Sequence, residues 1–295
     1  MNQKTRLEQD SIGKIKVSNS NFWGAQTQRS LKNFKIGNNL MPIEIIHALV
    51  TIKMACAKVN LKQKSLAPKI ANAIISASKN ILSGKHDDQF PLSVWQTGSG
   101  TQTNMNVNEV ISNRANILSG KSLIDSKYIK ANDEINMSQS SNDTFPTVTN
   151  IAVTKLVYEK LIPSTESFIK ILNKKVKEFS KDIKIGRTHM MDATPISLGQ
   201  EFSGYESQMK HGLKALKNTL KHLKQLAIGG TAVGTGLNAP DGFDVSVVKN
   251  ISYHTKINFE IAENKFEAIA SNDALVETHG AVSYTHLTLP TMMSV

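Results

Sequence analysis

Apolar residues recur along this chain at steps of three and four positions, which is the period of helices that bury one face. The first such stripe consists of Ile45, Leu49, Ile52, Cys56 and Val59. The same period predicts further helices that open at Pro68, run from Asn106 to Leu118, follow Pro163 and follow Pro195. In the last of these the pattern continues from Leu198 to Leu223, so it predicts one long helix.

Aromatic residues make up only 6% of the chain, whereas all hydrophobic residues together make up 40%. The core must therefore rest on aliphatic side chains, which favours packed helices over an aromatic-rich sandwich. A helix as long as the one predicted at 198–223 needs neighbouring helices to cover its apolar face. The 295 residues suffice for one large domain or two ordinary ones. We therefore expect a mainly α protein that includes a helical bundle.

Four polar stretches of unusual composition separate the predicted helices. They are rich in Gly, Ser, Thr, Asn and Gln and poor in Lys and Glu, and they lie at Trp95–Asn108, Asn132–Pro146, Gly186–Pro195 and Ile228–Asn238. Short hydroxyl and amide side chains beside glycines can converge on a small anion. The same residue types also form helix caps and turns, and a single stretch would favour that interpretation. Because four occur, each beside a helix, we favour a shared anion site.

The formal net charge of +11 comes from lysines that are spread along the chain. Such a charge is compatible with a nucleic acid, an anionic surface or a small anion as partner. Short runs such as Lys174, Lys175 and Lys177 are typical of a solvated helix face, and no aromatic residues alternate with them to stack on bases. We expect no nucleic-acid partner, and keep nucleic-acid binding only as an alternative.

The amino-terminal residues alternate charged and polar groups without an apolar segment, so we expect no signal peptide. No run of about 18 apolar residues occurs, so we expect no membrane span. The single cysteine, Cys56, lies on the first apolar stripe and is expected to pack as a small hydrophobic residue. Together these features predict a cytoplasmic protein.

Common cofactor and nucleophile motifs are missing from the sequence. The segment GGTAVGTG at 229–236 has the spacing of neither a P-loop nor a dinucleotide fingerprint, and no Gly-x-Ser-x-Gly elbow occurs. The cluster His86, Asp87 and Asp88 has no matching second cluster, so we expect no metal site. His189 is a better candidate. It follows Thr188 in a turn just before the long helix, where an imidazole can hold a water or a carboxylate near neutral pH.

Five blocks of the sequence together resemble class II fumarase, in that family's order and at its spacing, over about residues 6–281. The blocks are WGAQTQRS (Trp23–Ser30), WQTGSGTQTNMNVNEV (Trp95–Val110), QSSNDTFPT (Gln139–Thr147), GRTHMMDATP (Gly186–Pro195) and GGTAVGTGLN (Gly229–Asn238). Aspartase, argininosuccinate lyase and adenylosuccinate lyase share this scaffold and also release fumarate. The form of residues 98–102 is more similar to fumarase than to aspartase. An aspartase-type ammonia-lyase and a non-catalytic homologue stay open as alternatives.

The resemblance implies a fold and an assembly. It implies an N-terminal lyase domain at 1–138 and part of a central helical bundle at 139–281. In the family, four subunits build the bundle, and each active site draws residues from three of them. The expected protein is therefore a homotetramer that binds a small dicarboxylate and uses neither a metal nor another cofactor.

The resemblance also implies roles for particular residues. The substrate carboxylates would be bound by Ser99, Gly100, Thr101, Ser140, Ser141 and Asn142. Thr188 would donate to substrate, and His189 would be the catalytic residue that holds the water or relays a proton. A second anion site near the entrance would use Lys130, Asn132 and Asp133, although here lysine and alanine replace the family's histidine and proline in that turn.

The end of the sequence departs from the family pattern. Residues 282–295 show no helical period and are rich in β-branched side chains, so we expect them to be a non-family tail. The family's mobile loop, which resembles GSSIMPGKVNP and supplies a serine base and a lysine, does not occur among the 295 residues. We therefore expect little or no hydratase activity from this polypeptide by itself.

Overall fold

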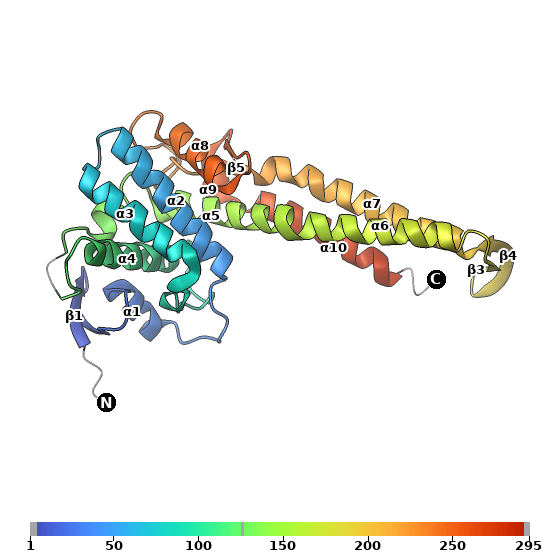
Figure 1. Cartoon of the computed structure of the whole chain (residues 1–295), viewed down its shortest axis with the longest axis horizontal. Coiled ribbons are helices and arrows are strands. Elements are labelled where there is room, and N and C mark those ends of the chain that lie inside the picture. The colour runs from blue at the N-terminus through green and yellow to red at the C-terminus, as the bar shows by residue number, and fades with distance from the viewer. Residues whose placement is uncertain (1–4, 125–126, 292–295) are drawn as a thin grey trace. The chain divides into compact units, whose positions relative to one another are not determined.

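The computed structural model describes residues 5–124 and 127–291, with side chains described as far as Tyr284. Helices dominate it, which confirms the predicted mainly α class (Figure 1). Within the described part of the chain, no helix combines the length and hydrophobicity that a membrane crossing would need.

The chain divides into two compact units. The N-terminal unit comprises Met1–Ala152 and Gln225–Ser271, and the bundle unit comprises Val153–Lys224 and Asn272–Val295. The chain passes from the first unit to the second within one helix, Ser141–Leu156, and returns after residue 224. The domain boundaries expected from the sequence, after residues 138 and 281, stay a prediction.

The N-terminal unit consists mostly of helices around one hydrophobic core. Its helices are α1 (Ala25–Asn33), α2 (Ile43–Lys62), α3 (Pro68–Asn80), α4 (Thr101–Leu118), most of α5 (Ser141–Leu156), α8 (Phe243–Thr255) and α9 (Lys265–Ala270). Short helical turns lie at η1 (Ile81–Lys85), η2 (Asp87–Gln89) and η3 (Ala131–Ile135). Two small sheets pair β1 (Thr5–Asp10) antiparallel with β2 (Gly13–Ser18), and β5 (Gln225–Leu226) parallel with β6 (Glu260–Ile261).

Helix α2 runs through the middle of this core and packs against α3, α4 and α8. The sequence predicted a single buried face, and the side chains of Leu49, Ile52 and Cys56 are indeed inaccessible. Burial is broader than that prediction, because α2 has neighbours on several sides and residues such as Lys53 and Met54 are buried as well. Cys56 packs as a small hydrophobic residue, as expected, and burial raises the pKa of its thiol.

Helix α4 begins five residues before the predicted start at Asn106. Gly100, in the left-handed conformation with φ of 65°, precedes the first helical residue. Apolar periodicity did not predict a helix for the polar residues at the start of α4, because their side chains are not apolar. From Thr103 onward they are nevertheless buried, and Asn104, Asn106 and Asn108 are each at most 2% exposed.

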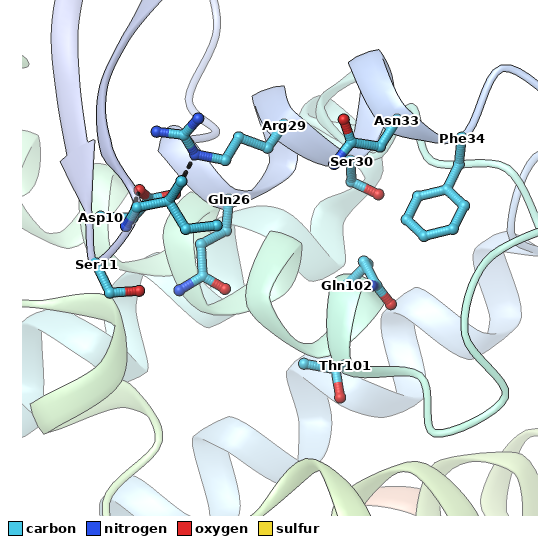
Figure 2. Close-up of a pocket in the computed structure, with 10 residues that line it drawn as sticks. Asp10, Ser11, Gln26, Arg29, Ser30, Asn33, Phe34, Thr101 and Gln102 are labelled. Atoms are coloured by element: carbon cyan, nitrogen blue, oxygen red, sulfur yellow. Dashed lines mark hydrogen bonds and ion pairs between the residues drawn. The ribbon is translucent and has the colours of Figure 1, made fainter.

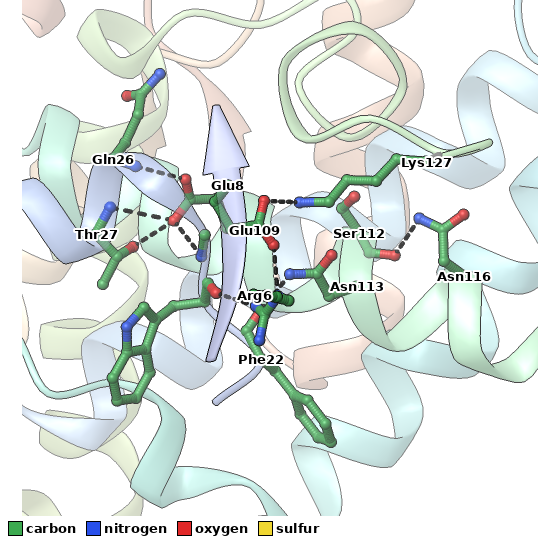
Figure 3. A network of polar contacts seen from close by, with 12 residues as sticks. Arg6, Glu8, Phe22, Gln26, Thr27, Glu109, Ser112, Asn113, Asn116 and Lys127 are labelled. Carbon is green, nitrogen blue, oxygen red and sulfur yellow. Dashed lines mark hydrogen bonds and ion pairs between the residues drawn. The ribbon is translucent and has the colours of Figure 1, made fainter. Parts of the chain in front are cut away.

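A buried carboxylate on α4 holds the start of α1. Glu109 accepts hydrogen bonds from the backbone amides of Gly24, Gln26 and Thr27 and from the Thr27 hydroxyl, at 2.6–3.1 Å (Figure 3). These amides belong to the first turn of a helix, which has no partners of its own for them. Glu109 thus caps α1 from a different helix.

The amino-terminal strand is fixed by a second polar group close to Glu109. The buried guanidinium of Arg6 donates to Glu8 Oε1 and to the Trp23 carbonyl, both at 2.7 Å, and Lys127 Nζ donates to Glu8 Oε2 at 2.6 Å (Figure 3). Every charge in this group meets an opposite charge or a carbonyl, which a buried ionic group requires.

The bundle unit contains three long helices that lie side by side, α6 (Ile162–Glu178), α7 (Leu198–Leu223) and α10 (Asp273–Thr291) (Figure 1). The turn η4 (Val157–Leu161) leads into α6, and the hairpin of β3 (Ile183–Thr188) and β4 (Met191–Ser197) joins α6 to α7. A capping box opens α7. Ser197 Oγ accepts from the Gln200 amide, and Gln200 Oε1 accepts from the Ser197 amide. The core of the unit includes Leu216, Leu220 and Leu223.

Helix α10 continues through residues 282–291, where the sequence shows no helical period. The lack of a helical period thus does not prevent a helical backbone here, and the prediction of a non-family tail stays a prediction. Adding residues to an existing helix is easier than starting a new one, so a segment without a helical pattern can continue a helix that begins at Asp273. Residues 292–295 of the predicted tail lie outside the described residues.

Candidate functional site

Two of the predicted anion-binding turns meet in the N-terminal unit. The hydroxyls of Ser99 and Thr101 share a hydrogen bond of 3.1 Å, and the hydroxyls of Thr101 and Ser141 share another of 3.1 Å. Thr97 extends this row, with 3.3 Å between its Oγ1 and Ser99 Oγ. Ser99 and Thr101 are exposed and Ser141 is half-buried, so the row of hydroxyls is accessible to a ligand. The structure thus brings together residues that the sequence placed 40 positions apart.

The first turn is held by a glutamine that the sequence reasoning did not single out. Gln96 Oε1 accepts from both the amide and the hydroxyl of Thr103, at 3.1 and 3.0 Å. The Thr103 amide lies in the first turn of α4 and has no helical partner, so Gln96 caps the helix. Gly100 is buried, and its left-handed conformation lets the chain turn directly into α4.

A buried aspartate holds the second turn and brings in a third polar stretch. Asp143 Oδ1 accepts from the Ser140 amide at 3.0 Å, and Oδ2 accepts from the amides of Gly229 and Thr231, both at 2.9 Å. Asn142 Nδ2 donates to the Ala232 carbonyl at 2.8 Å. Burial raises the pKa of Asp143, and these backbone hydrogen bonds oppose that rise. Three of the four polar stretches therefore converge.

Asp143 was not among the predicted site residues. The signal that could have identified it is an acidic residue inside a block of neutral polar residues, at the first turn of a helix. There a carboxylate can bind the free amides of its own turn and those of a neighbouring loop.

Thr188 and His189 belong to the bundle unit, whereas the hydroxyl row belongs to the N-terminal unit. The stretch Gly186–Pro195 forms the β3–β4 hairpin rather than a simple turn, and Thr188 pairs with Met191. His189 and Met190 form its two-residue loop with positive φ values of 51° and 59°. Such loops favour Asn and Gly, so two larger side chains here are strained. The His189 side chain is exposed and forms no hydrogen bond or ion pair with any described residue.

The residues of the predicted second anion site lie on an exposed turn at η3. Lys130 Nζ pairs with Asp133 Oδ2 at 3.1 Å, and this hydrogen bond raises the pKa of Lys130. The Lys130 amide donates to Glu134 Oε2, and Asn132 is exposed. The ammonium is thus partly neutralised by its own neighbour. The role of this turn stays a prediction.

The histidine and aspartates at 86–88 make contacts that need no metal ion. Asp87 pairs with His47 Nε2 at 2.8 Å, and His86 Nε2 forms a hydrogen bond of 2.7 Å with Asn80. Among the residues that the structure describes, no three His, Cys, Asp or Glu side chains form a group that could hold a metal ion.

A pocket of about 220 Å³ lies next to the hydroxyl row (Figure 2). The turn between β1 and β2, helix α1 and the first residues of α4 line it, and Thr101 and Gln102 are among the lining residues. Arg29 projects from α1 at this pocket, and its Nε donates to Asp10 Oδ2 at 2.7 Å. This ion pair joins the β1–β2 turn to α1.

Comparisons with known proteins agree with this fold and with the polar blocks. A family model described as lyase matches residues 13–293. The chain therefore belongs to this lyase family.

The chain is similar in sequence to curated class II fumarate hydratases. It is 53% identical over 285 residues to the class II fumarate hydratase of Pasteurella multocida, which covers 96% of this chain and 61% of the relative. The identity to the enzyme of Haemophilus influenzae is also 53%, with the same coverage. The chain thus spans about three fifths of the length of the curated relatives it matches.

Solved structures show the same fold. The class II fumarase from Schistosoma mansoni superimposes with a TM-score of 0.93 at 42% identity, over 96% of this chain and 62% of that one. A fumarate lyase:delta crystallin from Brucella melitensis bound to cobalt gives 0.89 at 33% identity, over 94% and 61%. The resemblance to class II fumarase is confirmed by these similarities.

Proposed function

We propose that this protein is a fumarate hydratase, which adds water reversibly to fumarate to give (S)-malate in the tricarboxylic acid cycle. The observation that carries the proposal is the hydroxyl row in which Thr101 and Ser141 share a hydrogen bond of 3.1 Å. It joins the two turns expected to bind a carboxylate. The similarity to class II fumarate hydratases supports the same conclusion. Because the chain spans about three fifths of those relatives, the proposal concerns the full-length protein.

The chemistry suits neutral donors. In the direction of malate dehydration, a base removes a proton from carbon three and the electron pair moves into the adjacent carboxylate, which becomes an aci-carboxylate. The carbon–oxygen bond at carbon two then breaks, and the hydroxyl leaves as water with a proton from an acid. Hydroxyl and amide groups of Ser99, Thr101, Ser141 and Asn142, fixed in place before the reaction, stabilise the added charge on the carboxylate.

Thr188 and His189 complete the site in this proposal. Thr188 donates to the substrate, and His189 holds the water or relays its proton. A subunit interface would bring the exposed hairpin of one subunit to the hydroxyl row of another, as the expected homotetramer requires. The strained hairpin loop and the unpaired His189 side chain support this arrangement.

The assembly has a simple test. The bundle unit exposes large apolar side chains, among them Ile171, Ile183 and Met191, which a partner subunit would cover. We expect the 295-residue chain to form loose oligomers or to aggregate. A clean, stable monomer in size-exclusion chromatography would contradict the proposed assembly.

The activity test is an ultraviolet assay of fumarate formation by the full-length protein, with malate and with aspartate as separate substrates. We expect turnover of malate only, and turnover of aspartate only would replace fumarase with the aspartase alternative. Thr101→Val keeps the shape of the side chain and removes its hydroxyl, so we expect a loss of about tenfold or more in kcat/KM. The control is Thr51→Val on α2, where the hydroxyl bonds only to the His47 carbonyl of its own helix.

Two further parts of the proposal concern a second anion site and the cellular location. The turn with Lys130, Asn132 and Asp133 would bind a second anion, and an unchanged inhibition by excess dicarboxylate in Lys130→Ala would count against it. The cytoplasmic location is proposed from the sequence, and fractionation of cells that produce the protein tests it.

A further inference from the structure

Lys53 is one of the largest fully buried side chains of the N-terminal unit, with 1% exposure. Lysine is almost never buried without a partner, because removing an ammonium from water is costly. Lys53 forms no ion pair with any described carboxylate, and its Nζ donates to a neutral acceptor, Asn136 Oδ1, at 2.9 Å. The burial of this charge is unexplained by the core alone.

The acceptor of Lys53 gathers donors from two helices. Asn136 Oδ1 accepts from Lys53 on α2 and also from Asn104 Nδ2 and Asn108 Nδ2 on α4, both at 3.2 Å. Asn104 lies one helical turn after Thr101, the first residue of α4. We call Lys53, Asn104, Asn108 and Asn136 the asparagine cluster. Through Asn104 it is linked to the first carboxylate-binding turn, which lies one helical turn earlier on the chain.

The same cluster holds the chain that leads to the second turn. Asn136 Nδ2 donates to the Gln139 carbonyl at 3.2 Å. One face of α2 carries both Lys53 and Asn60, and Asn60 Nδ2 donates to the Met137 carbonyl while its Oδ1 accepts from Ser138 Oγ. Helix α2 thus fixes residues 136–139, and Ser140 follows directly.

The buried ammonium also contributes a positive charge behind the two turns. A charge in a low-dielectric interior acts over a longer distance than one in water. Burial lowers the pKa of Lys53 to about 7, while the nearby Cys56 thiol and Asp143 carboxyl oppose that shift. Near neutral pH a substantial part of the population therefore carries the charge.

We propose that Lys53 is a positioning residue for the carboxylate site. Through Asn136 it holds the turns at Ser99–Thr101 and Ser140–Asn142 in register, and its ammonium form adds positive charge behind a site for a dianionic substrate. This inference rests on the proposed function. It also has a structural part, the hold on residues 136–142, that can be tested without any activity.

The kinetic test uses Lys53→Met in the full-length protein. Methionine has a similar length and no charge, and replacing a buried charge by such a residue is often neutral or stabilising. We expect KM for malate and for fumarate to rise about tenfold, with kcat changed by less than about threefold, because the variant loses both the hold on the two turns and the positive charge behind them. Lys53→Gln keeps a donor without the charge, and we expect an intermediate KM.

The matched control is Ser78→Ala on α3. It also removes a fully buried polar group, one whose hydroxyl has no hydrogen-bond partner among the described residues. Of the two residues, only Lys53 belongs to the asparagine cluster, so an effect that came merely from removing a buried polar group would appear in both variants. Unchanged KM values in Lys53→Met, or equal changes in both variants, would overturn the inference.

The structural test measures amide hydrogen exchange in the full-length protein. Lys53→Met is expected to increase exchange at residues 138–142 by about tenfold and to leave the hairpin Thr5–Ser18 unchanged. Equal exchange in the variant and the wild-type chain would overturn the proposed hold on the turn. If the full-length wild-type protein hydrates no fumarate, the proposed function fails while this exchange result still decides whether Lys53 holds the turn.

Discussion

Replacing Gly100 with alanine is predicted to damage both the stability and the substrate site of the N-terminal unit. Gly100 has φ of +65°, which costs a residue with a side chain about 1–2 kcal/mol. A Cβ there would also lie 2.1–2.5 Å from three ring atoms of Phe145, so the ring or the turn must move, and overpacking of this kind costs about 1–3 kcal/mol. The expected loss is therefore about 2–5 kcal/mol.

Gly98 supplies a matched control two residues away. A Cβ at Gly98 would have no atom within 4 Å, and its φ is not in the left-handed region. We expect Gly98→Ala to change the free energy of unfolding by less than about 1 kcal/mol. Adding Phe145→Leu to Gly100→Ala should recover the overpacking part and leave the backbone part, which a double-mutant cycle separates.

Urea unfolding followed by tryptophan fluorescence is the suitable assay. Both tryptophans of the chain, Trp23 and Trp95, belong to the N-terminal unit, so their signal reports on that unit. In the full-length enzyme the same displacement should raise KM for malate. Equal stability of Gly100→Ala and Gly98→Ala would refute the reasoning about both the turn and the Phe145 contact.

Three further predictions concern buried or partly buried ionisable groups. Glu109→Leu leaves the amides at the start of α1 without acceptors. We expect it to destabilise the N-terminal unit by about 2–4 kcal/mol in the same urea assay. A loss below about 0.5 kcal/mol would contradict the capping role. The folded-state pKa of Lys53 is about 7, below its ordinary value of 10.5, so the folded chain binds fewer protons between these values and gains stability as pH rises. The stability of Lys53→Met should not rise in this way with pH. Any excess of the variant's free energy of unfolding over that of the wild type should therefore shrink between pH 7 and pH 10. A pH-independent difference between the two would contradict the burial of the Lys53 charge. The third prediction concerns His254. Its pKa is lowered by burial and by the neighbouring Lys58, and Lys58 Nζ lies 2.5 Å from His254 Nε2. The folded state therefore loses stability as pH falls below 6.5, and Lys58→Met should raise the His254 pKa in an NMR titration. An unchanged titration curve would be inconsistent with this pair.

Much of the helical architecture could be predicted from hydrophobic periodicity. The predicted run from Leu198 to Leu223 is α7 itself, and α3 begins at the predicted Pro68. Both helices have one apolar face, which is what the period detects. The period was less informative for α2 and α4, because helices with neighbours on several sides bury residues all round.

Hydrophobic periodicity and composition did not predict the structure of the polar elements. Periodicity missed the start of α4 because the residues there are not apolar, and its buried asparagines bond to partners distant in sequence such as Asn136. The stretch Gly186–Pro195 is a strained hairpin, which composition alone cannot distinguish from a turn.

The candidate site was predictable in its parts but not in its supports. The blocks identified Ser99, Thr101 and Ser141, and the structure joins them by hydrogen bonds. The sequence did not predict roles for Asp143 and Lys53. A single charged residue within a helix resembles a solvent-exposed one until its neighbours in the fold are known.

The measurement that tests the central claim most directly is proton NMR of the full-length protein incubated with fumarate in D₂O. Hydration by anti addition predicts (S)-malate with one deuterium at carbon three, in a single stereochemical configuration, and predicts that Thr101→Val slows its formation while Thr51→Val does not. The absence of malate from a folded full-length protein, or malate labelled without stereochemical preference, would contradict the proposed function.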